Sequence, residues 1–234
     1  MLKILVIIPT YNEETTIIKL IDALLSLPIT LDILIVDDGS DETADLVRER
    51  RDREARLHLI KRNEKSGRGS AVLAGLKYGL ERDYDYLVEM DADFSHQPDE
   101  LPALIAVAEP NTVVIGSRYV KGSVIKGWPL ARRIFSKFAN FYANLILKIG
   151  LHDYTNGYRV YGRAALKKLD FEKIKASGYI VLSEIAYQLH RRGVKFKECK
   201  SLFVNRRRGQ SNFSLREVKE SFFSIPNIKK RYFR

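Results

Sequence analysis

The 234-residue chain contains one cysteine, Cys199, and one tryptophan, Trp128. A lone cysteine excludes an intramolecular disulfide and a cysteine-based metal cluster, and it fits a reducing cytoplasm. No run of about 18 apolar residues occurs, so we expect no segment to span a bilayer and any membrane contact to be peripheral. The apolar run at 2–8 stops at Pro9 without the small-residue cleavage pattern of a signal peptide, and we interpret it as a first strand.

The charge of the chain is divided unevenly between its halves. With 45% hydrophobic and 29% charged residues, the composition is that of a folded domain and excludes a disordered or collagen-like chain. Residues 1–117 hold 13 basic and 22 acidic side chains, whereas 118–234 hold 27 basic and 7 acidic ones. Residues 118–150 carry seven Lys or Arg and no acid. This asymmetry does not fit a uniformly basic nucleic-acid-binding coat, so no nucleic-acid partner is expected.

Short apolar runs alternate with helical patterns along the first half. Strands are predicted at 2–8, 31–36, 57–61, 86–90 and 112–115, and helices at 13–26, 41–55, 71–81 and 98–108. Such alternation is typical of parallel βαβ units and predicts an α/β fold with a doubly wound, mostly parallel sheet. On such sheets, ligands bind at the carboxyl ends of the strands.

Polar clusters follow four of the five predicted strands. They are Pro9-Thr10-Tyr11-Asn12-Glu13, Asp37-Asp38-Gly39-Ser40, Asp91-Ala92-Asp93 and Gly116-Ser117-Arg118. For Ser40 and Asp41, capping of the next helix and a functional role are equal alternatives. Capping does not require carboxylates at i and i+2, as in Asp91 and Asp93, which lie on one face at a strand end and can converge on one ion. Their oxygens suit Mg²⁺ or Mn²⁺ bridged to a diphosphate, while His96 is interpreted as an orienting group outside the metal ligands.

The motifs IIPTYNE, VDDGSDE, EMDADFSHQP, GSRYVKG, DYTNGYRVY and RRRGQSN occur in this order. Together they resemble the inverting nucleotide-sugar transferases of glycosyltransferase family 2, in the dolichyl-phosphate mannose synthase branch. The Gln-x-x-Arg-Trp signature of processive members is absent from the sequence. The resemblance implies one GT-A domain over 1–234, with a nucleotide-sugar and metal half at 1–117, an acceptor half at 118–204, and a basic C-terminal loop and helix at 205–234.

The resemblance also implies roles for individual residues. The nucleotide-sugar donor would be bound by Pro9, Tyr11, Glu13, Val36, Asp38, Asp91, Ala92, Asp93 and Arg206. Asp91 and Asp93 would hold Mg²⁺ or Mn²⁺ with Ser95, which stands where some relatives use Gln. Arg118 and Arg132 would bind the acceptor phosphate, and Asp93 and Arg118 would be catalytic. Guanidinium groups suit this task because they pair bidentately with phosphate oxygens and stay charged.

Other segments carry weaker signals. Residues 153–159 resemble an acceptor-side loop and 206–212 a loop that covers the donor, in which Asn212 replaces a Lys common among relatives. A turn with a helix cap explains Gly67-Arg68-Gly69 as well as a phosphate cradle does, so these residues are not assigned to catalysis. Glu184 is a reserve general base, needed only if the acceptor is a hydroxyl.

Two basic segments have amphipathic patterns. In the predicted helix at about 130–149, an apolar stripe lies beside a polar, cationic one; the apolar stripe comprises Ile134, Phe138, Phe141, Leu145 and Ile149. Packing of this stripe on the sheet is the ordinary explanation, but the absence of acids and the nearby Trp128 favour a helix at a membrane interface. A second such segment combines Leu215, Val218, Phe222 and Phe223 with Ile228 and the basic run 229–231.

We therefore expect a metal-dependent inverting transferase that moves mannose from GDP-mannose to dolichyl or another polyprenyl phosphate at the cytoplasmic face of a membrane. The alternative is a family 2 enzyme that uses UDP-glucose or another nucleotide sugar, with a lipid-phosphate or hydroxyl acceptor. A non-enzymatic basic binding module is the remote alternative. The sequence is compatible with a separate membrane subunit as a partner.

Overall fold

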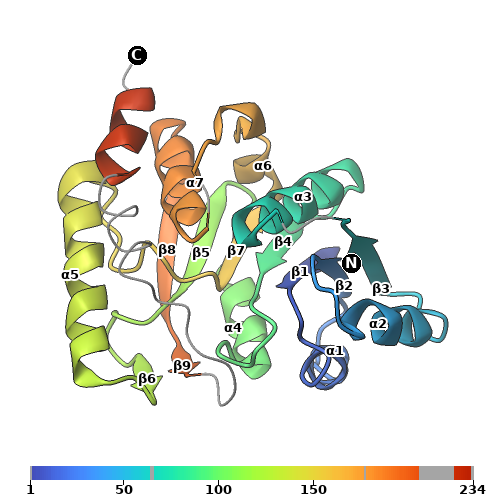
Figure 1. The fold of residues 1–234 in the computed structure, drawn as a ribbon. Helices are drawn as coiled ribbons and strands as arrows, with labels where there is room; N and C mark the ends of the chain where they lie inside the picture. Colours follow the sequence, from blue (N-terminus) through green and yellow to red (C-terminus); the bar gives the residue numbers. More distant parts are fainter. Residues whose placement is uncertain (1, 64–65, 177, 206–223, 233–234) are drawn as a thin grey trace.

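The computed structural model describes residues 2–63, 66–176, 178–205 and 224–232, which form a sheet covered by helices on both faces (Figure 1). Seven strands have the order β3-β2-β1-β4-β7-β5-β8. They are β1 (Ile4–Thr10), β2 (Asp32–Asp37), β3 (Leu57–Lys61), β4 (Tyr86–Glu89), β5 (Thr112–Ser117), β7 (Arg159–Gly162) and β8 (Lys195–Lys200). Only β7 runs antiparallel to its neighbours, β4 and β5. A second, two-stranded sheet pairs β6 (Val124–Lys126) with β9 (Leu202–Val204).

The doubly wound, mostly parallel sheet predicted from the sequence is confirmed. All five predicted strands are present as β1 to β5, with bounds that differ by a few residues. The predicted helix at 13–26 begins only at Ile17, because the carbonyl of Glu13 closes a turn with the N–H groups of Thr16 and Ile17. The sheet continues through β7 and β8, which have no βαβ pattern and were not predicted.

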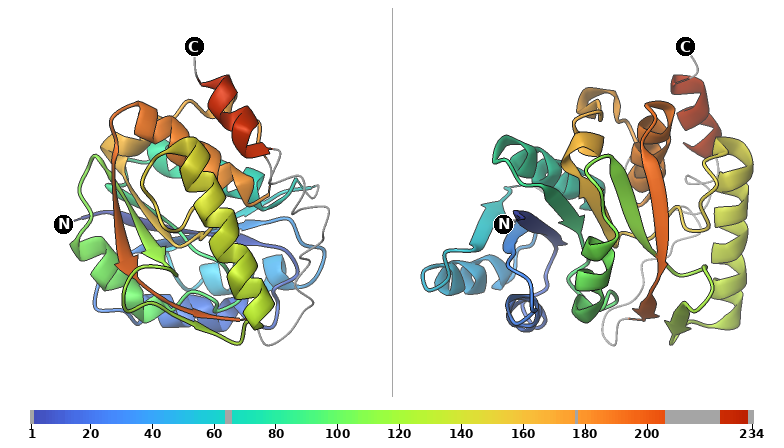
Figure 2. Two further views of the ribbon diagram at one scale, coloured as in Figure 1. Left: turned by 90° about the vertical axis from the view of Figure 1, so that its left-hand side faces the viewer. Right: turned by 180° about the vertical axis from the view of Figure 1, so that it is seen from behind.

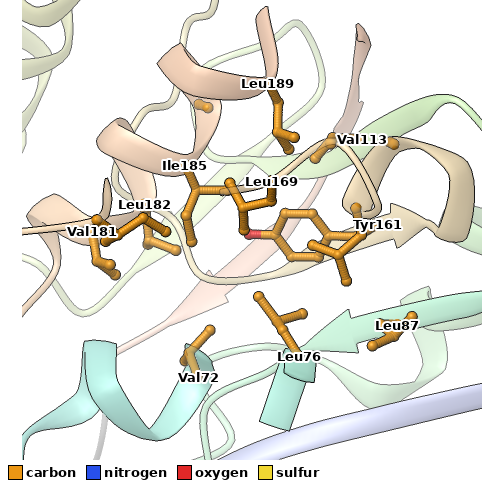
Figure 3. Close-up of a cluster of buried hydrophobic side chains, with 14 of the residues drawn as sticks. Val72, Leu76, Leu87, Val113, Tyr161, Leu169, Val181, Leu182, Ile185 and Leu189 are labelled. Carbon is orange, nitrogen blue, oxygen red and sulfur yellow. The ribbon is translucent and has the colours of Figure 1, made fainter. Parts of the chain in front are cut away.

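The helices form two layers (Figure 1). One layer comprises α1 (Ile17–Leu25), α2 (Thr43–Arg51) and α4 (Leu101–Ala106), preceded by the 3₁₀ turn η1 (Pro98–Glu100). The other comprises α3 (Arg68–Glu81), α6 (Arg163–Leu166) and α7 (Ile180–Arg191), with η2 (Phe171–Lys173) between α6 and α7. Each layer buries its own apolar cluster against the sheet. Figure 3 shows the second cluster, in which α3, α7 and the sheet surround the fully buried Tyr161.

Two glycines bring α3 close to the sheet. A Cβ atom at Gly75 would lie 2.3 Å from Cγ2 of Ile7, and one at Gly79 would lie 2.3 Å from Cδ2 of Leu87. Only a residue without a side chain permits this approach of helix to strand. The N-terminus of α3 is therefore held near the carboxyl ends of β1 and β4.

The long helix α5 (Leu130–Leu147) lies at the opposite end of the molecule from β3 (Figures 1 and 2). Most of its apolar stripe is exposed: Ile134 is 60% exposed, Phe141 65% and Leu145 60%, whereas Ile149 packs against the core. Its asparagines face inward instead. Asn140 accepts the N–H of Tyr154 at 2.7 Å, and Asn144 accepts the Tyr154 hydroxyl at 2.9 Å. The helix thus buries two asparagine-based contacts beside Ala143 and Leu147, while a second apolar stripe is left on its outer side.

Two residues that supported the expected membrane contact, Trp128 and Ile228, are buried. Trp128 is only 8% exposed, because Arg118, Arg132 and Phe203 lie against its ring. Ile228 is 1% exposed, because the helix at 224–231 packs Ile225 and Ile228 into the core. The residues 215, 218, 222 and 223 of the second amphipathic segment lie outside the described residues. Among the helices described, none is long and apolar enough to cross a bilayer.

We expect Gly75→Ala to destabilise the fold, although alanine normally favours a helix over glycine. The added methyl would overpack the contact with Ile7, at a cost of roughly 1–3 kcal/mol. The exposed Lys77→Ala in the same helix is the matched control and should change the free energy of unfolding by about 0.5 kcal/mol or less. Urea denaturation measures both, and a stabilised Gly75→Ala would contradict the close approach.

Candidate functional site

A cleft of about 470 Å³ opens at the carboxyl ends of the parallel strands. The loops after β1, β4 and β5 line it, together with one side of α5, the start of α7 and the loop before β7. The sequence-predicted residues on its wall are Pro9, Tyr11, Glu13, Asp38, Asp91, Ala92, Asp93, Ser95, Arg118 and Arg132. The polar clusters that follow the predicted strands are thus brought together at one edge.

On the β1–β2 side, neighbouring residues point in opposite directions. Asp38 lines the cleft, and both its oxygens accept nitrogens of Arg62 at 2.5 Å. Asp37 is fully buried, where it accepts the hydroxyl of Thr10 and the ammonium of Lys61, each at 2.7 Å. Val36 is also fully buried, in the core cluster beneath the cleft, and is not among the lining residues.

The Asp91–Asp93 segment is oriented by a buried histidine. Nδ1 of His96 accepts the backbone N–H of Asp91 at 3.1 Å, so Nε2 carries the proton and donates to Oδ1 of Asn156 at 2.8 Å. His96 also stacks on Tyr158 with 5.1 Å between ring centroids. Both ring nitrogens are therefore used, as expected of an orienting group. Ser95, 2% exposed, donates its backbone N–H to Oδ1 of Asp93 at 3.0 Å.

Arg68, which was not assigned to the site from the sequence, reaches its centre. It is the first residue of α3, and its Nε and Nη2 donate to Oδ1 of Asp91 at 2.9 and 2.6 Å. Nη2 also lies 2.8 Å from Oε1 of the fully buried Glu89. Burial raises the pKa of Glu89, while burial lowers the pKa of Arg68 but is outweighed by the two carboxylates, which raise it overall. Arg68 is therefore a fixed positive charge.

The donor set fits a hard divalent cation. Asp91 and Asp93 supply carboxylate oxygens after a buried strand, which is the ligand type that Mg²⁺ and Mn²⁺ prefer. No group of three or more His, Cys, Asp or Glu suited to a metal occurs among the residues that the structure describes. Two protein carboxylates match a cation that keeps waters and bridges to substrate phosphates.

Across the cleft, Arg118 is locked by Asp153. Nε and Nη2 of Arg118 donate to the two oxygens of Asp153 at 2.8 and 2.7 Å, and its backbone N–H donates at 3.0 Å. Nη2 also donates to the hydroxyl of Thr155 at 2.7 Å. Burial raises the pKa of Asp153, but the Arg118 guanidinium and backbone N–H groups outweigh it and hold the pKa below its ordinary value. The pair fixes the predicted acceptor-side loop beside β5.

Arg132 extends from α5 over the Trp128 ring, with its guanidinium carbon 4.1 Å from the ring centroid. The carbon of the Arg118 guanidinium lies 5.3 Å from the same ring. Trp128 therefore lies between two cations and sets their separation. The third predicted arginine, Arg206, lies outside the described residues, as does the predicted donor-covering loop 206–212 with Asn212.

Glu184, the reserve general base, does not line the cleft; its neighbour Ser183 does. Its carboxylate accepts the backbone N–H groups of Lys175 and Ala176 at 3.0 and 2.6 Å, as well as the Tyr232 hydroxyl at 3.0 Å. It also pairs with Arg231. Glu184 thus joins α7 to a loop and to the C-terminal helix, and no oxygen is left for a substrate proton.

A mostly parallel sheet with carboxylates and arginines converging at its carboxyl edge defines an α/β protein with a polar cleft where such sheets bind their ligands. Solved structures of similar fold include glucosyl-3-phosphoglycerate synthase from Mycobacterium tuberculosis. Its complex with Mn²⁺, UDP and glucosyl-3-phosphoglycerate has a TM-score of 0.65 at 19% identity, over 98% of this chain and 79% of that one. Its complex with Mn²⁺ and UDP-glucose also has a TM-score of 0.65, at 21% identity, over 98% and 78%. The chain therefore has the GT-A fold.

The sequence comparisons identify the family. The model of Glycosyl transferase family 2 matches residues 5–170. Polyprenol monophosphomannose synthase of Mycolicibacterium smegmatis is 39% identical over 224 residues, 94% of this chain and 84% of that protein. Undecaprenyl-phosphate mannosyltransferase of Micrococcus luteus is 37% identical over 225 residues, 96% of this chain and 93% of that protein. The chain belongs to glycosyl transferase family 2, and the resemblance inferred from its motifs is confirmed.

Removal of the Asp153 carboxylate should expose the charge of Arg118. Asp153→Asn leaves a buried guanidinium without its counter-ion, which typically costs about 3–5 kcal/mol of unfolding free energy at pH 7. Because the folded-state pKa of Asp153 is lowered, its contribution is present above the unfolded value of about 3.9 and is lost as the pH falls further.

Urea unfolding at pH 7 and pH 3 tests this expectation. The difference in unfolding free energy between wild type and Asp153→Asn should be smaller at pH 3. Asp22→Asn is the control, because Asp22 is 56% exposed in its pair with Arg50 and should contribute about 1 kcal/mol or less. A difference that is the same at both pH values would show that the ion pair is not its source.

Proposed function

We propose that the chain transfers mannose from GDP-mannose to a polyprenyl phosphate of the dolichyl type, with inversion at the anomeric carbon and with Mg²⁺ or Mn²⁺. Two mannosyltransferase relatives whose names specify a polyprenol and undecaprenyl phosphate support this substrate class, at 39% and 37% identity. The protein would act as a peripheral membrane protein at the cytoplasmic face of a membrane, where the single cysteine, Cys199, stays reduced.

The observation that carries the proposal is that α5 lines the cleft with one side and presents an exposed apolar stripe on another. One side of the helix lines the cleft with Arg132, Phe135, Ser136, Ala139 and Tyr142. Another side presents the exposed stripe formed by Leu130, Ile134, Phe138, Phe141 and Leu145. A polyprenyl phosphate can therefore bind with its phosphate in the cleft while its apolar chain runs along the helix into a lipid surface. A small soluble acceptor would have no use for such a stripe.

The donor is expected on the acidic side of the cleft. Pro9, Tyr11, Glu13 and Asp38 would contact the nucleoside, and Asp91 and Asp93 would hold the cation, with Ser95 beside them. When bound, a divalent cation there would neutralise charge that develops on the leaving nucleoside diphosphate. His96 contributes by holding the backbone of Asp91, so the carboxylates keep one orientation through the reaction.

The acceptor is expected on the arginine side. One phosphate oxygen of the polyprenyl phosphate would attack the anomeric carbon, forming a C–O bond while the bond to the nucleoside diphosphate breaks on the opposite face. A phosphate monoester is largely ionised near neutral pH, so this chemistry needs no general base, in agreement with the structural use of Glu184. Arg118 and Arg132 would bind and orient the nucleophilic phosphate.

Peripheral membrane contact through α5 follows from its composition. The exposed apolar side chains can enter the interfacial region, while Lys137 and Lys148 on the same helix surface are exposed and can meet anionic headgroups. Each basic residue near an anionic leaflet contributes on the order of 1 kcal/mol.

Asp93→Ala should lower mannose transfer at least about 100-fold at saturating Mn²⁺, because one of two protein carboxylates for the cation is lost. The assay supplies radiolabelled GDP-mannose and a polyprenyl phosphate, with UDP-glucose as the competing donor. Asp99→Ala is the matched control, since Asp99 is an exposed carboxylate in η1 that does not line the cleft. Near-normal turnover of Asp93→Ala would refute the metal assignment, and a product formed only from UDP-glucose would refute the donor.

Paired substitution of Phe141 and Leu145 by Asp should weaken binding to vesicles that contain anionic lipid by at least tenfold, as measured by co-sedimentation. Transfer to a short-chain prenyl phosphate in solution should change much less. Val107→Asp replaces a 38% exposed apolar residue next to α4 and is the control. Equal vesicle binding by the pair and the control would remove α5 from the membrane contact.

A further inference from the structure

Arg68 places a positive charge directly on the predicted metal ligand. Its Nε and Nη2 both donate to one oxygen of Asp91, Oδ1, at 2.9 and 2.6 Å. We propose that Arg68 occupies Asp91 while the cleft holds no donor, and that it makes binding of the divalent cation dependent on the nucleoside diphosphate. This inference rests on the proposed function, in which Asp91 and Asp93 hold the cation of a nucleotide-sugar donor.

The guanidinium competes with a cation for the same carboxylate. Two N–H groups already point at Oδ1, so a cation that binds this oxygen must displace them or share it with a like charge. Repulsion between cations in a partly desolvated site is far stronger than in water. The free protein should therefore bind Mn²⁺ or Mg²⁺ weakly, although two acidic ligands are in place.

Arg68 is held at this position by groups behind the cleft. Glu89 is fully buried and needs a counter-charge, which Nη2 of Arg68 supplies at 2.8 Å. The Tyr161 hydroxyl donates to the other Glu89 oxygen at 3.2 Å. A Cβ atom at position 157 would lie 2.1 Å from Nη2 of Arg68, so Gly157 leaves the space that the guanidinium fills. The contact with Asp91 is thus built into two strands and the loop before β7.

A diphosphate reverses the effect of this charge. Without donor, the guanidinium repels a second cation; with donor, the added phosphate charge attracts both cations together. Nη1 of Arg68 is buried and makes no hydrogen bond among the residues described, so a phosphate oxygen that reaches the guanidinium would satisfy it. Cation and nucleotide should therefore each strengthen the binding of the other, and such coupling is reciprocal.

The test measures Mn²⁺ binding through the electron paramagnetic resonance signal of the free ion, with and without GDP. Arg68→Gln should bind Mn²⁺ alone about threefold or more tighter than the wild type, and Mn²⁺ with GDP about tenfold weaker. Arg68→Lys, which keeps the charge but not the fork, should lie between them. Arg56→Gln is the matched control, because Arg56 pairs with Glu54 outside the cleft and should change neither value.

Loss of Arg68 leaves Glu89 buried without its partner, so the double variant Arg68→Gln with Glu89→Gln removes both charges and keeps the fold testable. Tighter binding of Mn²⁺ alone together with weaker binding of Mn²⁺ in the presence of GDP supports the proposal. The proposal is overturned if, without GDP, either variant binds Mn²⁺ no more tightly than the wild type does. It is also overturned if the wild type binds no Mn²⁺ in the presence of GDP. A wild type with the expected coupling that transfers no mannose refutes the proposed function alone.

Discussion

Three carboxylates in or behind the cleft wall each contact an arginine: Asp38 with Arg62, Asp91 with Arg68, and Asp153 with Arg118. Parallel strands bring acidic loops to one edge of the sheet, where their charges would repel one another and lose hydration. The guanidinium groups make this convergence tolerable and, because their geometry is fixed, they also set where each carboxylate points. The ion pairs that allow these carboxylates to be folded into the cleft wall therefore also fix their orientation.

The division of the chain into an acidic and a basic half corresponds to the two sides of the cleft, although the basic excess is not all available to ligands. The charge of Arg118 is partly offset by Asp153, and Arg159 is fully buried, where its nitrogens donate to the backbone carbonyls of Tyr154, Asn156 and Leu182. Arg159 thus forms the support of the loop before β7. Net charge alone overstates the positive field that an acceptor phosphate would meet.

The first five strands could be predicted because each is a mainly apolar run, and four of them end in polar clusters that parallel strands must place together. β7 and β8 could not, because β7 has only Val160 and Tyr161 as hydrophobic residues and β8 alternates with lysines at the edge of the sheet. Arg68 was missed for a related reason: its sequence context describes a helix start, and its partner Glu89 is hidden within a strand. Gly157 is connected to the position of Arg68, because a side chain there would occupy the space of the guanidinium. This relation becomes visible only in the folded structure. For α5 the periodicity was visible, but which stripe faces inward depends on Tyr154, whose bonds to two asparagines no helical pattern encodes.

The reversed direction of β7 has a further consequence for how the two halves of the cleft relate. A parallel strand delivers the loop after it to the cleft, whereas β7 delivers the loop before it, residues 153–157. β7 also separates β4 from β5 by two strand spacings, about 10 Å in all, which is a gap of molecular size between the carboxylates and Arg118. The loop at 153–157 contacts both sides of the cleft: Asp153 pairs with Arg118, while Asn156 accepts a hydrogen bond from His96, which holds Asp91. One inverted strand thus couples the loop after β5 to the loop after β4 through a single short segment.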